Sequence, residues 1–243
     1  MPSTLIVIPT YNEYANIADI IHAVLSLPQL FDLLIIDDNS PDGTANAVEA
    51  LKNIYPERLH LQTRPGKLGL GTAYIKGFTW GMEHQYDYII EMDADFSHNP
   101  NDIPRLLEAC TNGADVVIGS RYVKGGKVEN WPADRILLSK WASVYVRLIT
   151  WMPVKDTTAG FVCYKRKVFE KIDLNKIKFI GYAFQIELKF AAWRSGFHMQ
   201  EIPITFKDRE KGISKMSKGI FKEAVIGVLK MKWQSFYSNY LRK

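Results

Sequence analysis

Two carboxylates, Asp93 and Asp95, stand one residue apart directly after the apolar run 88–92. A hard divalent cation such as Mg²⁺ prefers oxygen ligands, and proteins usually hold it with one or two carboxylates plus the phosphates of a substrate. A pair of this kind at the end of a strand therefore indicates a metal site that holds a nucleoside diphosphate. A solvated surface turn produces the same acid-x-acid pattern, so the neighbouring elements have to distinguish the two interpretations.

Short β-branched runs alternate with amphipathic stretches through the first half of the chain. The alternation of strand and helix implies right-handed crossovers and a mostly parallel sheet flanked by helices, which is an α/β fold. Ligands in such sheets bind at the carboxyl ends of the strands. Buried strands are predicted over 5–8, 33–36, 59–62, 87–92 and 115–118, helices over 17–27, 44–54, 71–82 and 103–110, and a final strand over 199–206.

Polar loops follow three of these predicted strands, over 9–13, 37–43 and 93–98. Each loop contains acidic residues, and the carboxyl ends of parallel strands meet at one edge of a sheet, so the three loops are expected to share a cleft. The glycine-rich segment 66–71 lacks the Gly-Lys-Ser/Thr ending of a phosphate-binding loop, which argues against a nucleoside triphosphatase.

The composition is that of an ordinary globular protein. With 243 residues, 47% hydrophobic and 23% charged, the chain is long enough for one domain with a full core. Its apolar runs fall far short of the roughly 20 residues that a spanning helix needs. The N-terminus lacks the pattern of a secretory signal, and the two cysteines, Cys110 and Cys163, suit a reducing compartment, so a cytoplasmic location is predicted.

The positive charge is concentrated near the C-terminus. Residues 207–243 contain ten Lys or Arg and three acidic residues, a net charge of +7, whereas residues 1–206 carry −2. An anionic partner is therefore expected there, and an anionic membrane surface and a nucleic acid both satisfy the charge. A nucleic-acid-binding protein using this segment would bind oligonucleotides with a steep salt dependence. A solvated helix face is the third interpretation.

Taken together, the motifs resemble those of glycosyltransferase family 2. Within that family they look most like the dolichyl- or polyprenyl-phosphate mannose synthases, and the resemblance covers nearly the whole chain. The matching segments are 9–13, 37–44, 66–71, 93–95, 119–122, 156–161, 181–182 with Glu187, and 214–216. The resemblance implies the GT-A fold, a Rossmann-like α/β architecture, and no nucleic-acid partner, although the nucleic-acid-binding alternative stays open.

The resemblance also implies an activity. It is the transfer of mannose, with inversion, from GDP-mannose to a polyprenyl monophosphate of the dolichyl or undecaprenyl type, giving polyprenyl phosphate mannose and GDP. One alternative is transfer of glucose or an amino sugar from a UDP-sugar to the same class of lipid. Another is a sugar-nucleotide-binding protein without catalysis.

The donor-binding residues follow from the family's motifs. Carboxylates there accept hydrogen bonds from base or ribose, and the ring of Tyr11 offers a flat apolar face. Ser97 stands where some relatives have Gln near the metal; because a hydroxyl is a weaker ligand, a bridging water is the alternative to direct coordination. The resemblance assigns Pro9, Tyr11, Glu13, Ile36 and Asp38 to the nucleoside pocket, Asp93, Ala94 and Asp95 to the donor diphosphate, and Asp93, Asp95 and Ser97 to a Mg²⁺ or Mn²⁺ ion.

The acceptor requires cations rather than a general base. A lipid monophosphate has a second pKa of about 6, by analogy with phosphorylated side chains, and attacks as an anion. Arginine grips phosphate through paired bonds and lysine as a point charge. The catalytic candidates are Asp95, Arg121, Arg209 and Lys215. The basic loop 208–217 is expected to close over the donor, Asp134 and Asp156 are expected to cap a helix or stabilise a loop, and Glu187 is placed near the sugar by the family's pattern.

Two amphipathic segments suit contact with a membrane. Both present aromatic and aliphatic side chains at helical spacing beside basic residues, as interfacial helices do. The first, 135–152, has Leu137, Trp141, Val144, Leu148 and Trp151 with Lys140 and Arg147; the second, 218–240, has Phe221, Val225, Leu229, Trp233 and Phe236 with Lys222, Lys230 and Lys232. The alternatives are that both stripes pack on the core, or that each helix uses both of its faces in part.

The predicted organisation is a single catalytic domain. It comprises a nucleotide-binding half over 1–122, an acceptor half over 123–216 and a basic amphipathic helix over 217–243. Relatives in the family often carry transmembrane helices after this domain, and this chain ends without them. The expectation is therefore a protein that binds peripherally to the cytoplasmic face of a membrane, or through a small membrane subunit.

Overall fold

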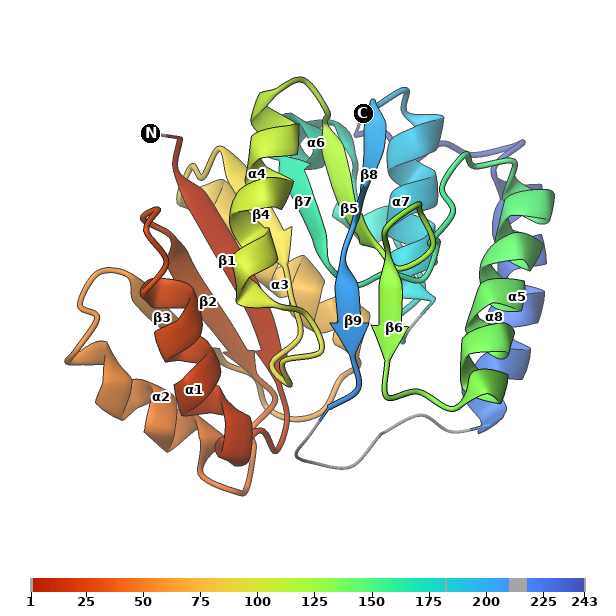
Figure 1. Ribbon diagram of the computed structural model, residues 1–243. Coiled ribbons are helices and arrows are strands. Elements are labelled where there is room, and N and C mark those ends of the chain that lie inside the picture. Colours follow the sequence, from red (N-terminus) through yellow and green to blue (C-terminus); the bar gives the residue numbers. More distant parts are fainter. Residues whose placement is uncertain (1, 182, 210–217, 243) are drawn as a thin grey trace.

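The computed structural model of the chain describes residues 2–181, 183–209 and 218–242, apart from the side chains of 218–224. In this part of the chain a seven-stranded sheet with strand order β3-β2-β1-β4-β7-β5-β8 forms the centre (Figure 1). Its strands are β1 (Thr4–Thr10), β2 (Asp32–Asp37), β3 (Leu59–Thr63), β4 (Tyr88–Glu91), β5 (Val116–Ser120), β7 (Val162–Lys165) and β8 (Met199–Pro203). A small parallel pair, β6 (Lys127–Glu129) with β9 (Thr205–Lys207), lies beside it.

Helices cover both faces of the sheet, and each face has its own apolar core. Side chains from α1 (Tyr14–Leu25), α2 (Thr44–Lys52) and α4 (Ile103–Thr111) fill one core. Those of α3 (Leu70–Glu83), α6 (Arg166–Lys171) and α7 (Phe184–Arg194) fill the other. Because the central strands are buried on both faces, they appear in the sequence as continuous apolar runs rather than alternating ones.

The predicted α/β fold with a mostly parallel sheet is confirmed, with two differences. Strand β7 was not predicted; it has only four residues and runs antiparallel to both β4 and β5. The predicted strand 199–206 is divided at Ile204, so that β8 joins the large sheet and β9 joins the small one. An antiparallel strand departs from the strand–helix alternation on which the prediction rests, and 199–206 is unbroken by glycine.

Helices α5 (Ala133–Thr150) and α8 (Lys218–Gln234) lie side by side at the edge of the molecule beyond β6 (Figure 1). The Tyr145 hydroxyl on α5 donates to the Val225 carbonyl oxygen on α8 at 2.9 Å. Within α5 only Ser143, Val146 and Thr150 are buried. The pair therefore adds a third structural unit to the two helical layers.

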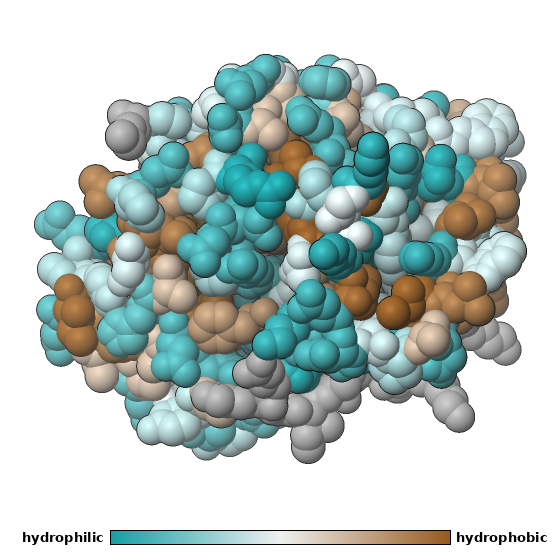
Figure 2. All heavy atoms as spheres, in the orientation of Figure 1, coloured by the Kyte–Doolittle hydropathy of each residue, from teal (hydrophilic) through white to brown (hydrophobic). Residues whose placement is uncertain are grey.

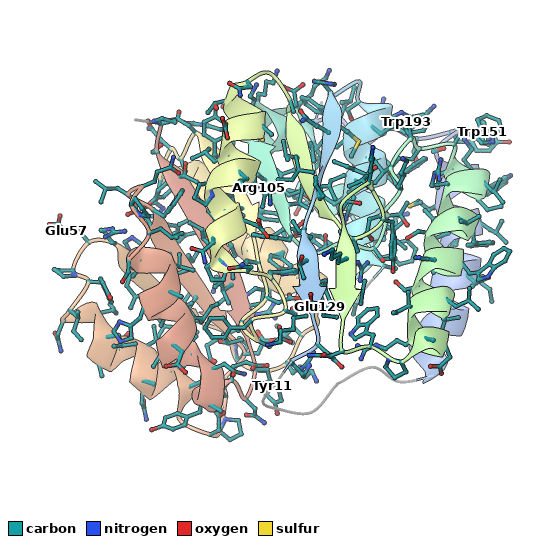
Figure 3. All side chains as sticks on the ribbon, in the orientation of Figure 1. Tyr11, Glu57, Arg105, Glu129, Trp151 and Trp193 are labelled. Atoms are coloured by element: carbon teal, nitrogen blue, oxygen red, sulfur yellow. The ribbon has the colours of Figure 1, made fainter. Side chains whose placement is uncertain are left out.

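The apolar stripes of this pair face outward instead of packing on the core. Trp141 is 63% exposed and Leu148 is 69% exposed. Figure 2 shows apolar side chains gathered along the edge formed by α5, and Figure 3 shows Trp151 projecting from its end. The exposed members are Leu137, Leu138, Trp141, Val144, Leu148 and Trp151 with Ile226, Leu229, Trp233, Phe236 and Tyr237, which we call the α5/α8 apolar surface. The alternative that these side chains pack on the core is therefore wrong. In the described residues, every helix is too short or too polar to cross a membrane.

Candidate active site

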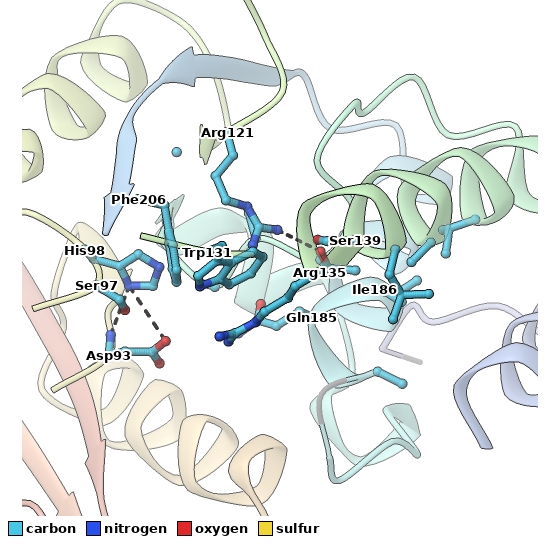
Figure 4. A pocket seen from close by; sticks show the side chains of 18 of the residues that line it. Asp93, Ser97, His98, Arg121, Trp131, Arg135, Ser139, Gln185, Ile186 and Phe206 are labelled. Atoms are coloured by element: carbon cyan, nitrogen blue, oxygen red, sulfur yellow. Dashed lines mark hydrogen bonds and ion pairs between the residues drawn. The ribbon is translucent and has the colours of Figure 1, made fainter. Parts of the chain in front are cut away.

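A cavity of about 450 Å³ opens at the carboxyl ends of β4 and β5 and extends between helices α5, α7 and α8 (Figure 4). Its two ends differ in chemistry. The strand end presents the polar side chains of Asp93, Asp95, Ser97, His98, Arg121, Arg135, Asp208 and Arg209. The helix end presents Leu138, Trp141, Ala142, Tyr145, Val146, Ile186, Val225 and Val228. The structure thus joins a charged compartment to an apolar channel.

The two carboxylates predicted to hold a metal both line the charged compartment. Asp95 is buried; it accepts the Ser97 backbone N–H at 3.1 Å and lies 3.1 Å from Nη2 of Arg209. The Asp93 side chain opens into the cavity, with 41% of its surface accessible. Partial desolvation by the walls of the cavity, with Asp95 and Glu91 nearby, raises the pKa of Asp93 to about 7. A bound cation would return it to the ionised form.

The side chains in this compartment fit a divalent cation shared with a diphosphate. Ser97 Oγ is buried and has no hydrogen-bond partner within the described structure, so it is available beside the two carboxylates. No group of three or more His, Cys, Asp or Glu side chains in the described residues forms a complete ligand set. Mg²⁺ bound by one or two carboxylates keeps positions for phosphate oxygens and water, and this partial shell suits that arrangement.

His98 supports the carboxylates as a neutral ring. Its Nδ1 accepts the Asp93 backbone N–H at 3.2 Å, and the ring stacks on Phe161 with centroids 4.9 Å apart. Burial lowers the pKa of His98 to about 4, with Arg121 acting in the same direction and Asp95 and Asp156 opposing it. His98 therefore holds the Asp93 backbone in place without contributing a charge.

Arg121 is held in one orientation by a buried ion pair. Its Nε and Nη2 donate to the two carboxylate oxygens of Asp156 at 2.7 and 2.6 Å, and Nη2 also donates to Thr158 Oγ1 at 2.8 Å. Glu201 on β8 holds this loop in turn, since its carboxylate accepts the Lys155 and Asp156 backbone N–H groups at 2.7 and 2.9 Å. The prediction that Asp156 stabilises a loop is confirmed, and the guanidinium is presented to the cavity on a rigid support.

Arg135 and Ser139 line the same cavity and were not among the predicted site residues. The Arg135 guanidinium lies 4.0 Å from the centre of the Trp131 ring and its Nη1 donates to Asp208 at 3.1 Å. Arg135 entered the sequence analysis only as the first residue of an amphipathic segment, and Ser139 was not singled out. Both residues lie at the start of α5, where the helix approaches the strand ends. This proximity depends on the tertiary structure and does not show in the sequence pattern.

The residues expected around the nucleoside surround the ends of β1 and β2, next to the cavity but outside its lining. Figure 3 shows Tyr11 at the edge where β1 ends. Nζ of Lys67 lies 5.0 Å from the Tyr11 ring centre. Pro9 pairs with Ile36 across the two strands. The Ile36 side chain is fully buried in the core, so this residue can contribute to a nucleoside site through its main chain alone. Glu13 accepts from Asn16 at 3.1 Å.

Asp38 forms an ion pair with Arg64, a residue that the sequence analysis did not identify. Its two carboxylate oxygens accept from Nε and Nη2 of Arg64 at 2.5 and 2.7 Å, and both side chains are buried. Arg64 Nη1 also donates to Thr72 Oγ1 at 2.7 Å. The pair thus ties the end of β2 to the start of α3, and Asp38 meets a nucleoside as part of an ion pair.

The glycine-rich segment 66–71 serves close packing of two backbones. Gly71 donates its backbone N–H to the Ile180 carbonyl oxygen at 2.8 Å. A Cβ on Gly69 would lie 2.7 Å from the same oxygen, and Gly69 has a φ of 101°, which favours glycine. This geometry agrees with the prediction that the segment is not a phosphate-binding loop.

Two further predicted residues fall outside the cavity or outside the described structure. Glu187 is buried and accepts the Lys178 and Phe179 backbone N–H groups, both at 2.8 Å, and the Tyr240 hydroxyl at 3.2 Å. Glu187 therefore does not line the cavity, and its side chain anchors the C-terminal residues to α7. Lys215 lies outside the described residues, as does most of the loop 208–217, of which Asp208 and Arg209 are described.

Comparison with known proteins places this site in a family. Residues 5–173 match the family described as Glycosyl transferase family 2. The chain belongs to glycosyl transferase family 2. This glycosyltransferase is 47% identical over 225 residues to the polyprenol monophosphomannose synthase of Mycolicibacterium smegmatis, covering 93% of this chain and 85% of that protein. It is 44% identical to the undecaprenyl-phosphate mannosyltransferase of Micrococcus luteus, covering 95% and 96%.

A more distant relative is longer than this glycosyltransferase. The dolichol-phosphate mannosyltransferase of Pyrococcus furiosus is 37% identical over 236 residues, which are 94% of this chain and 64% of that protein. Among solved structures, glucosyl-3-phosphoglycerate synthase of Mycobacterium tuberculosis, in complex with Mn²⁺, UDP and phosphoglyceric acid, superposes with a TM-score of 0.68 at 16% identity, covering 95% of this chain and 78% of that one. This likeness establishes the GT-A fold.

Proposed function

We propose that this glycosyltransferase transfers mannose from GDP-mannose to a polyprenyl monophosphate, with inversion, and releases GDP. The names of the two relatives at 47% and 44% identity support mannose as the sugar and a polyprenyl phosphate as the acceptor. Both relatives align with more than nine-tenths of this chain, so the resemblance is not confined to one half of it.

The cavity with two chemically different ends carries the proposal. A polyprenyl phosphate has a dianionic head and a long apolar tail, and the cavity offers three arginines at one end and an apolar channel between α5 and α8 at the other. Buried apolar contact contributes about 25 cal/mol per Å² of surface removed from water, so the channel favours an isoprenoid chain over a soluble sugar acceptor. A nucleotide-binding protein without a second substrate would have no use for such a channel.

The donor is proposed to bind across the edge of the sheet, from the ends of β1 and β2 to the cavity. Asp93, Asp95 and the Ser97 hydroxyl would hold Mg²⁺ or Mn²⁺ against its diphosphate. The ion, when bound, would neutralise the negative charge that develops on the departing GDP. Arg209, 3.1 Å from Asp95, adds a further positive charge at the same place.

The acceptor phosphate needs orientation rather than activation. Since its oxygens are already anionic at neutral pH, one of them can attack the anomeric carbon directly, on the face opposite the leaving GDP. Arg121 and Arg135 line the cavity between the carboxylates and the apolar channel, and we assign them to the acceptor phosphate. Arg121 is fixed by Asp156, so its orientation is already set before the substrate binds.

Access to the acceptor requires a membrane surface, because a polyprenyl tail stays in the bilayer. Leu138 and Trp141 of the α5/α8 apolar surface also line the cavity, and this surface carries tryptophans suited to the headgroup level. We therefore propose peripheral association with the cytoplasmic face of a membrane through this surface. A small membrane subunit could share the same contact.

A panel of nucleotide sugars tests the proposal. Purified protein is incubated with labelled GDP-mannose, UDP-glucose or a UDP-amino sugar, together with undecaprenyl or dolichyl phosphate in detergent. Lipid-extractable label is expected from GDP-mannose alone, and D95N should reduce it at least about 1,000-fold while its circular dichroism stays that of the wild type. Label transferred from a UDP-sugar instead would refute the choice of donor, and full activity of D95N would refute the assigned site.

A further inference from the structure

Gln185 is a polar residue that lines the cavity and has no role yet in the proposed transfer of mannose. It lies at the start of α7, is buried, and faces the charged compartment. Figure 4 shows it between Asp93 and His98 on one side and Ile186 on the other. It therefore stands between the end assigned to the diphosphate and the end assigned to the lipid, where the sugar has to lie.

Two buried charged residues determine which way the Gln185 amide points. Nζ of Lys189 has three N–H donors, and they face the Ala159 carbonyl oxygen at 2.6 Å, the Gln185 carbonyl oxygen at 2.9 Å and Gln185 Oε1 at 3.4 Å. Nε2 of Gln185 donates to the Glu91 carboxylate at 2.9 Å. Lysine can only donate and an ionised carboxylate can only accept, so the amide oxygen must face Lys189 and the amide nitrogen must face Glu91.

Burial of these two charges is costly, which indicates that the arrangement has a purpose beyond packing. Glu91 and Lys189 are both fully buried, and they are bridged by Gln185 instead of forming a direct ion pair. Burial lowers the pKa of Lys189 to about 8, as expected for a charge placed in a low dielectric. An apolar core at the same place would be at least as stable.

The side of the amide nitrogen turned toward the cavity has room for a ligand. A Cβ on Gly160 would lie 3.6 Å from Gln185 Nε2 and 3.8 Å from His98 Cε1, so glycine leaves the space between these side chains open. One N–H of Gln185 is donated to Glu91, and the amide group has a second. A single hydroxyl group of a ligand can approach the amide nitrogen there without a side chain at position 160 in the way.

We propose that Gln185 recognises the donor sugar by donating its second N–H to a hydroxyl oxygen of the hexose over Gly160. Glu91 and Lys189 are positioning residues that prevent the amide from flipping. The inference rests on the proposed function and adds to it a residue that distinguishes one hexose from another. A fixed donor discriminates between epimeric hydroxyls because the wrong epimer leaves a buried N–H without its acceptor.

The test compares the donor with the same nucleotide lacking the sugar. Dissociation constants for GDP-mannose and GDP are measured by calorimetry, with metal present, for the wild type, Q185M and E187Q. Q185M is expected to weaken GDP-mannose binding about tenfold and to leave GDP binding unchanged, because the lost hydrogen bond belongs to the sugar. E187Q is the matched control: it is a buried residue of the same helix that faces away from the cavity, and both constants should match those of the wild type.

The roles of the positioning residues are tested by measuring how well a variant discriminates between two donor sugars. K189M keeps the volume of the lysine stem but lets the Gln185 amide rotate. The ratio of kcat/KM for GDP-mannose to kcat/KM for GDP-glucose should therefore fall at least about fivefold, while the dissociation constant of GDP stays unchanged. Should Q185M not fold, Q185N retracts the amide and gives the same comparison. Equal ratios in the wild type and the Gln185 variant would overturn the inference alone, whereas a wild type that transfers no mannose from GDP-mannose to the lipid would overturn the proposed function with it.

Discussion

At the scale of single residues, the charges around the cavity are held by other buried groups rather than by water. Arg121 is paired with Asp156, and Asp38 with Arg64, all four being buried. Removing one member of a buried pair leaves the other charge without compensation, which costs far more than removing a surface pair. The stability of this protein is therefore expected to depend on the same residues that shape its site.

Asp156→Asn is expected to destabilise the fold by about 3 kcal/mol, because it leaves the buried Arg121 guanidinium without a counter-charge. Urea unfolding followed by circular dichroism measures the change. Glu49→Gln is the control: its pair with Lys52 is exposed, and its loss should cost no more than about 0.5 kcal/mol. Equal effects of the two substitutions would contradict the buried-pair interpretation.

The lowered pKa of Lys189 predicts a specific pH dependence of the free energy of unfolding. Because the pKa of Lys189 falls from 10.5 to about 8 on folding, the folded state binds fewer protons than the unfolded state between these values, and this contribution to stability increases as the pH rises. The free energy of unfolding of the wild type, relative to that of K189M, should therefore rise by about 3 kcal/mol from below pH 8 to pH 10.5.

Unfolding curves in urea at pH 7.5, 8.5 and 9.5 follow the Lys189 effect, and the difference from K189M removes the contribution of every other titrating group. A difference that stays flat over this range would show that Lys189 keeps its ordinary pKa in the folded state.

At the scale of elements, α5 and α8 differ from the other helices in what they bury. Helices α1, α3 and α7 place apolar side chains against the sheet, whereas α5 buries only three residues and presents its tryptophans outward. A contiguous exposed apolar surface on a protein marks an interaction site. Two of its members, Leu138 and Trp141, also line the cavity, so the same helices can enclose a lipid and contact the surface that supplies it.

Trp141→Ser combined with Leu148→Ser is expected to reduce binding to anionic lipid vesicles at least about 30-fold, since each side chain contributes about 1.5–3 kcal/mol when buried in an apolar phase. Stability in urea should change by less than about 0.5 kcal/mol, because both side chains are exposed in the protein. Vesicle co-sedimentation measures the first quantity.

The control for the vesicle experiment removes the same kind of side chain elsewhere. Leu30 and Ile54 are 74% and 61% exposed, lie outside α5 and α8, and can both be changed to serine. Unchanged sedimentation is expected for this double variant. If both double variants lost vesicle binding equally, the α5/α8 apolar surface would not be the contact.

At the scale of the whole molecule, one sheet brings together residues from distant parts of the chain. Strands β7 and β8, which follow residue 122, complete the sheet begun by β1 to β4, so the nucleotide-binding and acceptor segments share a single framework. The carboxylates line an open cavity rather than the core, which separates metal binding from folding.

Removal of divalent metal by EDTA is therefore expected to abolish mannose transfer without unfolding the protein. The thermal midpoint of the chain alone should change by less than about 2 °C, and GDP should raise it only when Mg²⁺ or Mn²⁺ is present. Differential scanning fluorimetry and the transfer assay measure the two effects. Full transfer in EDTA, with metal-free reagents, would contradict the role assigned to Asp93 and Asp95.

Much of this protein was determined by local sequence pattern. Apolar runs located six of the seven strands of the large sheet, Asp93-Ala94-Asp95 marked the charged compartment, and helical spacing located the stripes of α5 and α8. These features are encoded locally because a strand, an acidic turn and an amphipathic helix each depend on residues a few positions apart.

The roles of the buried polar residues were decided by tertiary structure. Glu187 was assigned to the sugar, yet it binds the backbone at 178–179, while Gln185, two positions earlier, faces the cavity. Gln185 meets Glu91 across 94 positions of sequence, and Arg121 meets Asp156 across 35. The physical reason is that a hydrogen bond or ion pair is defined by distance and direction between two side chains, and only the packed sheet brings these partners within reach.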